Sequence, residues 1–428
     1  MTEAFLQYVW QYQLLEGPLK TTDGQVVCVS KVGMLNHDAG PDFISCRLRI
    51  GDVNWAGNVE VHVKSSDWNQ HHHSRDHAYD NVVLHVVYEH DADVAIDGKR
   101  LLPTLELKHF IPTVLWDNYE ALLSPPPDLG IACAKDLSSV PPIQFHAYLE
   151  RLLVERLQRK TEMVRRLLDE SKGSWEHTCY WMIAHYFGGV TNSLAFELLA
   201  KATDYRLLAR WKDNPQRLEA LLFGQAGMLE EDFQDEYPLS LQSDYLALKS
   251  GAKLMPISSY LWRFFRLRPS AFPTLRISQF AQLLSKNPNL FSQLLDFRDV
   301  ASLKSFFAVS ASDYWTTHYQ FDQSSRACRK TTGQSFVLGL IVNAWIPLLF
   351  EYGVQHGNEK YKDLALELLS QLPPEKNHII SLWVDSGIPV KDAFQSQALI
   401  QLYNEYCKSK NCLNCRLGYF AISKSLSE

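Results

Sequence analysis

The chain has 428 residues, enough to bury sizeable cores, and this length predicts two or three domains. Its 46% hydrophobic and 21% charged residues are typical of a globular protein and exclude a disordered one. The net charge of −6 excludes a global attraction to nucleic acid or anionic lipid, so any nucleic-acid surface has to be a local patch.

The composition also bears on where the protein works. The first 17 residues lack a basic region and a small-residue cleavage site, so we expect no secretory signal. The longest apolar run, 336–350, is too short to span a bilayer and contains Asn343 and Pro347, which favours a buried helix. Eight cysteines without regular spacing fit a reducing compartment. We therefore predict a cytoplasmic protein that does not enter a membrane.

Residues 1–120 predict a small α/β head. Phe5, Tyr8 and Val9 share one face of a short amphipathic helix. Strand-like segments follow, separated by Gly, Asn and Asp, and the "IGD" at 50–52 predicts a tight hairpin. The strand-like segments are 25–30, 42–50, 53–65, 81–88 and 101–108.

The rest of the chain predicts helices. Prolines in 122–130 and 140–142 indicate a linker, which we place at 121–145. A long amphipathic pattern at 143–170 opens a helical body that we extend over 146–428. The predicted fold class is therefore α+β, with a mixed sheet in the head and helices beyond it.

The strand "NVEVHVK" carries the first candidate site. Alternation along a strand places Glu60, His62 and Lys64 on one face and three valines on the other. We expect the valines to face a core and the polar trio to line solvent or a cleft. Asp42 opens the partner strand across the hairpin. Two carboxylates can hold Mg²⁺ or Mn²⁺ while a neighbouring base orients water, so Asp42, Glu60, His62 and Lys64 are candidate catalytic residues.

The loop that follows, "DWNQHHHSRDHAYDN", is rich in histidine and aspartate. If it folds back over the sheet, His73 and Asp76 can join the metal held by Glu60, and His85 on the next strand is a further candidate ligand. Imidazole together with carboxylate suits Mn²⁺, Zn²⁺ or Fe²⁺ better than Mg²⁺. The alternative is a solvated loop tip and a hydrogen-bonded core histidine.

A second candidate metal site lies near the C-terminus. Cys407, Cys412 and Cys415 form C-x4-C-x2-C, and two thiolates on a tight turn can share Zn²⁺ or an iron–sulfur cluster. A fourth ligand would have to come from a distant part of the chain, with Cys133 and Cys328 as candidates. The alternative is three reduced cysteines at the end of a helix.

A third candidate site is the arginine-rich stretch 261–280. Arg266, Arg268 and Arg276 are interleaved with aromatic residues, a combination that binds single-stranded nucleic acid by clamping phosphates and stacking on bases. The alternative is that the aromatics form a core and the arginines pair with acids such as those of 229–237. Two other stretches of unusual composition, 219–229 and 312–321, indicate no chemistry.

The head resembles the PD-(D/E)xK nuclease superfamily. Pro41-Asp42 matches its "PD", and Glu60-Val61-His62 matches "ExK" with His in place of Lys; Lys64 could supply the missing charge. The resemblance implies a restriction-endonuclease-like core of helix, three antiparallel strands, helix and strand. A literal E-x-K at 106–108 has no acid before it on an adjacent strand.

The same resemblance bears on the cysteines. Some helicase-associated nucleases of this superfamily hold a cluster with one upstream and three C-terminal cysteines, which implies Cys133 as the fourth ligand.

Nearly the whole chain also resembles the bacterial domain of unknown function family 2851. The stretches that carry this resemblance are "AGPDFISCRLRIGDVNWAGNVEVHVKSSDW", "YDNVVLHVVYEHD", "PTLELK", "EALLFGQAGML", "RLRPSAFPTLRISQ" and "YCKSKNCLNC". This family implies no established activity.

The sequence thus predicts a metal-dependent nuclease, or an inactive relative, with nucleic acid as its partner. One alternative is a scaffold that binds nucleic acid or protein without catalysis. Another is a metal-dependent hydrolase that acts on a small substrate. Convergence of Asp42, Glu60 and His62 in a pocket would favour an enzyme, and a convex face would favour a scaffold.

Overall fold

The structure is a computed structural model that describes residues 1–96, 100–126, 130–251 and 254–424. The chain forms two compact units. The first unit contains Met1–Tyr148, Ser381–Ile388 and Leu402–Glu428, and the second contains Leu149–Ile380 and Pro389–Gln401. The C-terminal cysteines therefore belong to the same unit as the sheet. Of the predicted linker at 121–145, residues 127–129 lie outside the described residues.

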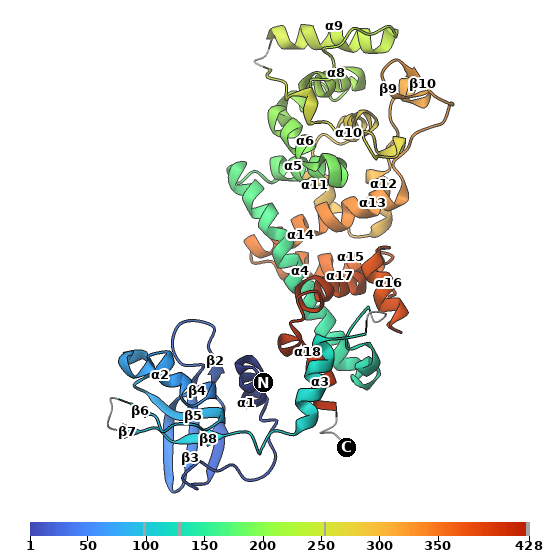
Figure 1. Cartoon of the computed structure of the whole chain (residues 1–428). Helices are drawn as coiled ribbons and strands as arrows, with labels where there is room; N and C mark the ends of the chain where they lie inside the picture. Colours follow the sequence, from blue (N-terminus) through green and yellow to red (C-terminus); the bar gives the residue numbers. More distant parts are fainter. Residues whose placement is uncertain (97–99, 127–129, 252–253, 425–428) are drawn as a thin grey trace. The chain divides into compact units, whose positions relative to one another are not determined.

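The first unit is built on a mixed six-stranded sheet (Figure 1). Strands β1, β3 and β4 pair antiparallel, β2 pairs with β3, and β4, β5 and β8 pair parallel. The strand bounds are β1 Val27–Lys31, β2 Met34–Leu35, β3 Phe43–Ile50, β4 Val53–Lys64, β5 Val82–Glu89 and β8 Thr104–Glu106. A small separate ribbon joins β6 (Ala95–Ile96) to β7 (Arg100–Leu101). The predicted α+β class with a mixed sheet is confirmed.

The predicted hairpin joins β3 to β4. Ile50 pairs with Val53, which leaves Gly51 and Asp52 as a two-residue turn. Gly51 has a φ of +57°, which glycine adopts without the penalty that a side chain would bring. This turn fixes the register and so determines which residues of β4 lie opposite the beginning of β3.

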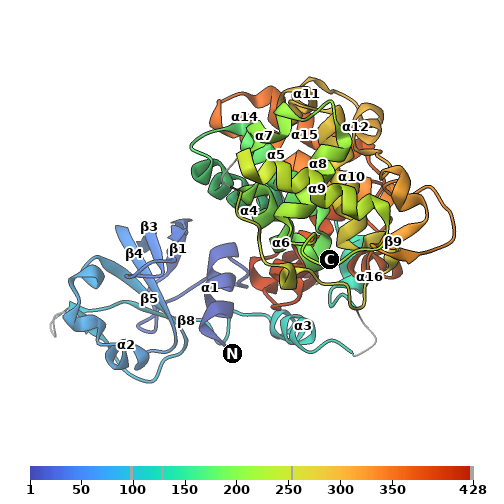
Figure 2. The ribbon, with the colours of Figure 1, turned by 90° about the horizontal axis from the view of Figure 1, so that it is seen from above.

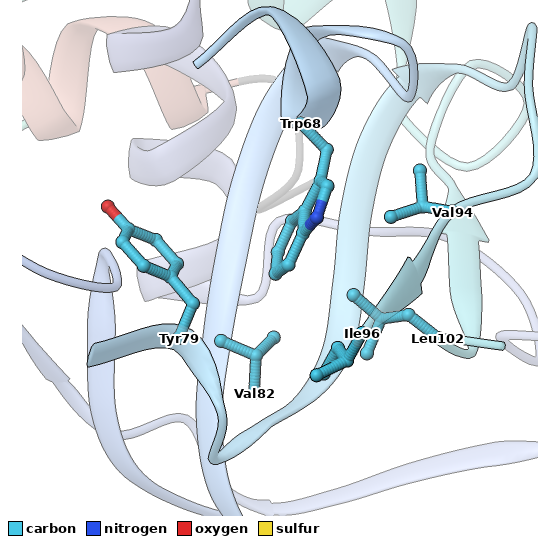
Figure 3. Packing of buried hydrophobic residues seen from close by; sticks show 6 residues of the cluster. All are labelled: Trp68, Tyr79, Val82, Val94, Ile96 and Leu102. Atoms are coloured by element: carbon cyan, nitrogen blue, oxygen red, sulfur yellow. The ribbon is translucent and has the colours of Figure 1, made fainter. Parts of the chain in front are cut away.

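The connection from β4 to β5 has to cross over because these strands are parallel. It contains α2 (Asp67–Gln70) and two single turns, η1 (His73–Arg75) and η2 (His77–Tyr79). Trp68 of α2 is fully buried in an apolar group with Val82, Val94 and neighbouring side chains (Figure 3). Its Nε1 donates to Ser74 Oγ at 2.9 Å. This tryptophan holds the histidine-rich segment against the sheet.

Helix α1 (Glu3–Tyr12) begins at Thr2, whose hydroxyl accepts from Phe5 N. Phe5, Tyr8 and Val9 are buried. The helix packs against β4, and Figure 2 shows it beside the sheet. Its last turn also contacts the C-terminal segment, because the ring centroids of Tyr12 and Tyr419 lie 5.0 Å apart. Helix α1 therefore links the sheet to the end of the chain.

The remaining elements of the first unit pack around the C-terminal helix α18. This helix contacts α3, η3 and η9. The bounds are α3 Thr113–Leu123, η3 Ala134–Ser139, η8 Tyr403–Cys407, η9 Cys412–Asn414 and α18 Arg416–Ser423. Lys424 pairs with Asp136 at 2.9 Å, which joins the end of α18 to η3.

The second unit is helical. Its helices pack in pairs, among them α5 with α6, α8 with α9, and α14 with α15. Their bounds are α4 Pro142–Glu170, α5 Trp175–Phe187, α6 Gly189–Ala202, α7 Tyr205–Arg210, α8 Pro215–Gln225, α9 Glu236–Gly251, α10 Pro273–Lys286, α11 Leu290–Asp296, α12 Val300–Phe307, α13 Gln334–Leu340, α14 Ile346–Gln355, α15 Glu359–Gln371, α16 His378–Asp385 and α17 Ala393–Leu402. A short ribbon of β9 (His318–Gln320) and β10 (Gln323–Ser324) adjoins α10. Helix α4 begins in the first unit, and α16 and α17 each contain residues of both units.

The apolar run at 336–350 lies in one continuous helix over Gln334–Gln355, whose middle turn (Ile341–Trp345) is π-helical. This helix has 22 residues, so the prediction that it is too short for a membrane was wrong on length. However, 67% of its apolar window is buried inside the fold. The helix therefore belongs to the core of the second unit.

The stretches 219–229 and 312–321, for which the sequence indicated no chemistry, meet in one buried network. The carboxylate of Glu219 on α8 is fully buried. It accepts hydrogen bonds from Ser312 Oγ at 3.0 Å and Trp315 Nε1 at 3.3 Å. It also accepts from Tyr237 Oη and from Ser278 Oγ. Donors from three separate segments satisfy this carboxylate, so it joins α8 to α9, to α10 and to the segment that precedes β9.

A second buried carboxylate, Glu197 on α6, has cationic partners. Lys201 Nζ lies 2.7 Å and Arg166 NH1 3.1 Å from its Oε1, and His185 Nδ1 lies 3.0 Å from its Oε2. Burial alone raises the pKa of Glu197, but the hydrogen bonds from Lys201, Arg166 and His185 outweigh it and lower the pKa to about 2.

The lowered pKa of Glu197 predicts a pH-dependent stability. The ionised carboxylate stabilises the fold above its unfolded pKa of about 4.3, and this contribution is lost as pH falls toward the folded value. We expect Glu197→Gln to lower the free energy of unfolding by about 2 kcal/mol at pH 7 and by progressively less below pH 5. Urea unfolding across this range measures it, with the exposed Glu162→Gln as control. A difference that stays constant with pH would contradict the assignment.

Candidate metal centre

The centre of the site is the carboxylate of Glu60 on β4. Glu60 is 4% exposed and His62 is 1% exposed. Glu60 lies beside His85 of β5 in the parallel register, so both side chains point to the same face of the sheet. Val59 and Val61, on the other face, are fully buried too. Of the two expected positions for the polar residues, solvent was wrong for Glu60 and His62, because the crossover covers this face.

Asp42 and Glu60 are fastened to each other through the backbone. Asp42 N donates to Glu60 Oε2 at 3.0 Å, and Val61 N donates to Asp42 Oδ2 at 3.0 Å. The β3–β4 hairpin creates this arrangement, because Phe43, which follows Asp42, pairs with Val59. Burial and then the charge of Glu60 raise the pKa of Asp42 to about 7. Two carboxylates held this close favour either a shared proton or a bound cation.

Two imidazoles lie beside the same carboxylate, and a third lies beside one of these imidazoles. His62 Nε2 lies 3.5 Å and His73 Nε2 lies 3.4 Å from Glu60 Oε1. His71 Nδ1 lies 3.1 Å from His62 Nε2. Between His71 and His73, His72 adopts the left-handed conformation with a φ of +61°. This turn of the backbone lets both neighbouring histidines of the triplet face the sheet.

The spacing of these donors fits a single metal ion. A tetrahedral ion with metal–nitrogen distances of 2.0–2.1 Å has donors roughly 3.4 Å apart, close to the separations observed here. The ligand atoms of His62, His71 and His73 all lie within 4.8 Å of one another. Burial, together with the neighbouring His73 and His71, lowers the pKa of His62 to about 3. His62 is therefore neutral, which is the form of imidazole that binds metals.

A second layer of residues positions the imidazoles. His85 Nε2 lies 2.8 Å from His62 Nδ1, and burial lowers the pKa of His85 well below its usual value. The ring of Tyr79 stacks on His73 with centroids 3.8 Å apart. Trp68 contacts the rings of both His73 and His85. His85 therefore orients His62 from behind, as the outer partner of a metal-bound histidine does.

The structure brings together some of the predicted site residues and separates others. Asp42, Glu60, His62 and His73 converge, and we call them, together with His71, the head site. Lys64 is exposed, and within the described residues its Nζ makes no hydrogen bond or ion pair with the head site. Asp76 is exposed and accepts from Ala78 N, so it caps the turn η2 and lies apart from the set that could hold a metal.

One residue of α1 contacts this site and a second lies near it, and neither was predicted. The side chain of Gln7 hydrogen-bonds to Asp42. Burial and then the charge of Glu60 raise the pKa of Glu3. Their spacing of four residues places both on one side of the helix, which is the signal the sequence contained. His71 was a third omission, although the histidine triplet itself was noted.

A polar cavity of about 460 Å³ adjoins the head site through Gln7. Besides α1, its walls come from the segment before β3 and from the loop between the C-terminal cysteines. The polar lining residues are Gln7, Gln11, Asn36, His37, Ser409, Lys410, Asn411 and Asn414. Gln7 thus connects the head site to a space that donors and acceptors line.

The predicted arginines differ in their surroundings. Arg266 and Arg268 are exposed, and Phe265 beside them is 80% exposed. Arg276 instead lies over the ring of Phe336 at 3.5 Å and donates to Gln279, and burial lowers its pKa to about 10. In the described part of the chain none of the three forms an ion pair with a carboxylate. Arg276 therefore has a packing role, whereas Arg266 and Arg268 face solvent.

The donor geometry predicts the metal affinity of two variants. We expect His71→Ala and His73→Ala each to weaken Zn²⁺ or Mn²⁺ binding by about 10- to 100-fold, because each removes one nitrogen ligand. Isothermal titration calorimetry of the metal-free protein measures this. His77→Ala is the matched control, because His77 belongs to the same loop but pairs with Asp80 in solvent. Equal affinities in all three variants would contradict the site.

Comparison with known proteins gives a family but no activity. No curated protein and no solved structure matches the chain. A model of a family described as protein of unknown function matches residues 3–378, which is most of the chain. The chain therefore belongs to the family of unknown function DUF2851.

Proposed function

We propose that this protein is a divalent-metal-dependent nuclease. The observation that carries the proposal is the convergence of two carboxylates and three imidazoles at the β3–β4 hairpin, centred on Glu60. The order of helix, antiparallel strands, crossover helix and parallel strand is the one implied by the resemblance to PD-(D/E)xK nucleases. This order supports a fold similar to that of these nucleases. Because one fold can host many functions, the activity needs its own experiment.

Each residue of the head site has a distinct task in this proposal. Glu60, His62, His71 and His73 would hold the ion, and Asp42 would contribute a second carboxylate from β3. When bound, such an ion neutralises phosphate charge and lowers the pKa of a water molecule. His71 is the most exposed of the ligands, so a phosphodiester would approach from its side. His85 and Tyr79 keep His62 and His73 in orientation.

An exposed aromatic and basic surface supports nucleic acid as the substrate. Tyr260 is 75% exposed and Phe265 is 80% exposed, and the guanidinium of Arg266 lies 5.2 Å from the centroid of Phe265. Arg263 and Arg268 are exposed nearby in the sequence. Exposed rings can stack on bases while arginines contact phosphates. This surface belongs to the second unit.

A second candidate is a metal-dependent hydrolase for a small substrate. It is favoured by the low exposure of Glu60 and His62 and by the bounded size of the adjoining cavity. A duplex would have difficulty reaching ligands that are almost fully covered. A single strand or a small ester would reach these ligands more easily than a duplex.

For either candidate, we propose a cytoplasmic location. All eight cysteines are free in the structure, which fits a reducing compartment.

The nuclease proposal predicts a metal-dependent cleavage that requires Glu60. We expect wild-type protein to cut single-stranded DNA or RNA in Mn²⁺, and Glu60→Gln to lose at least about 100-fold in rate, because the amide cannot replace the carboxylate ligand. Gel assays on single-stranded and duplex DNA and RNA with Mg²⁺, Mn²⁺ or Zn²⁺ measure this. Asp76→Asn is the matched control, since it makes the same change of carboxylate to amide at an exposed residue of the crossover that caps η2.

Three outcomes separate the possibilities. Cleavage by wild type and Asp76→Asn but not by Glu60→Gln supports the nuclease. Equal cleavage by all three proteins points to a contaminant and rejects the site. If none of them cleaves nucleic acid but wild type hydrolyses a chromogenic phosphodiester or carboxylic ester, the small-substrate hydrolase is the better reading.

The exposed arginines predict a nucleic-acid affinity. We expect Arg266→Glu combined with Arg268→Glu to weaken binding of a single-stranded oligonucleotide by about tenfold or more and to reduce its salt dependence. Fluorescence anisotropy at several salt concentrations measures both. Arg206→Glu combined with Arg298→Glu has the same change of charge at two other exposed positions of the second unit. Equal weakening by both pairs would indicate a general charge effect and contradict a defined surface.

A further inference from the structure

Four cysteines from two distant parts of the chain come together in the first unit. They lie immediately before η3, at the end of η8, in η9 and immediately before α18. All are free thiols: Cys133 and Cys415 are buried, and Cys407 and Cys412 are half-buried. We call them the cysteine group: Cys133, Cys407, Cys412 and Cys415.

The packing around α18 brings the upstream cysteine to the other three. Cys133 immediately precedes η3, and its carbonyl accepts from Asp136 N. Helix α18 contacts both η3 and η9, and the pair Lys424–Asp136 fastens η3 to the end of that helix. Cys133 immediately precedes η3 and Cys415 immediately precedes α18, so the contact between these two elements brings the two cysteines to one region. Cys328, the other predicted fourth ligand, is exposed in the second unit.

The local backbone around Cys412 and Cys415 is a ligand turn. Cys415 N donates to Cys412 O at 3.2 Å, which closes the C-x2-C segment into a single tight turn. Tyr148 Oη donates a hydrogen bond to Cys415 Sγ at 3.5 Å, and the backbone N–H groups of Gly418 and Leu417 also donate to this sulfur. Donors aimed at a sulfur are the groups that stabilise a metal-bound thiolate.

We propose that the cysteine group binds an iron–sulfur cluster. The choice of cluster over a single ion rests on spacing. Four thiolates around one Zn²⁺, with Zn–S distances of 2.3 Å, lie about 3.8 Å from one another. Within the described residues, the histidine trio is the set whose ligand atoms all lie within 4.8 Å, so no three sulfurs of the cysteine group come that close. A cluster of several irons, each bound by different thiolates, accommodates wider spacing.

The cysteine group also frames the cavity beside the head site. Residues 409–411 and 413–414, between Cys407 and Cys415, form one wall, and α1 forms another. On α1, the side chain of Gln7 contacts Asp42. The pKa of Tyr8 on the same helix is raised mainly by burial, and Cys415 is among the smaller causes. The cluster would therefore fix a wall of the cavity that Gln7 connects to the head site.

The proposal is tested on the full-length protein purified without oxygen. We expect about two to four irons with matching acid-labile sulfide per chain and the visible absorption of thiolate-bound iron. Cys133→Ser should lose most of the iron and the absorption, while Cys328→Ser keeps both. Hydrogen exchange of residues 409–414 should rise in Cys133→Ser, which checks the role in the wall.

Each result of these measurements supports or overturns the cluster, and none of them requires catalytic activity. One zinc per chain without iron overturns the cluster in favour of a single ion. Absence of metal from anaerobically purified wild type overturns metal binding altogether. Equal iron loss in Cys133→Ser and Cys328→Ser rejects the ligand assignment. Because wild-type iron content is measured first, a Cys133→Ser protein that fails to fold leaves the proposal testable. A wild-type protein that holds iron but cleaves nothing leaves the cluster standing and rejects the nuclease.

Discussion

Burial of the Glu60 carboxylate is the constraint on which the first unit depends. A carboxylate that is removed from water needs hydrogen-bond donors or a positive charge. The hairpin supplies one donor, Asp42 N, and places a second carboxylate beside Glu60. The crossover supplies imidazoles, and Trp68 holds that crossover down. The turn at Gly51, the tryptophan anchor and the left-handed His72 therefore serve one purpose, which is to surround a buried anion.

Helix α1 connects the two candidate metal centres. One side of it reaches the head site through Glu3 and Gln7. The other reaches the C-terminal segment through Tyr8 and Tyr12, both of which contact Tyr419. A ten-residue helix is marginal alone, so its position depends on these partners. A change at either centre would thus be transmitted as a change in the packing of α1.

The local features of the fold could be predicted from the sequence, and the long-range ones could not. Alternation and turn chemistry found the strands and the hairpin, since these depend on neighbouring residues. Convergence of Asp42 with Glu60 followed from the hairpin. Asp76 and Lys64 do not lie with this pair. The position of Asp76 depends on how the crossover packs, and that of Lys64 depends on where β4 extends into solvent. Glu219 and Ser312 lie 93 residues apart. Neither stretch alone could therefore show that Ser312 donates a hydrogen bond to the buried Glu219 carboxylate.

The unsatisfied atoms of the head site favour a cation over a proton as the missing partner. Among the described residues, His73 Nε2 and His85 Nδ1 are buried without a hydrogen-bond partner. A proton shared by Asp42 and Glu60 would relieve their repulsion and leave the nitrogen of His73 unpaired. A divalent ion near Glu60 Oε1 would engage His73 and His62 and also relieve both carboxylates. One ion would thus engage the His73 nitrogen and relieve the repulsion between the carboxylates together, which a proton shared by the carboxylates would not do.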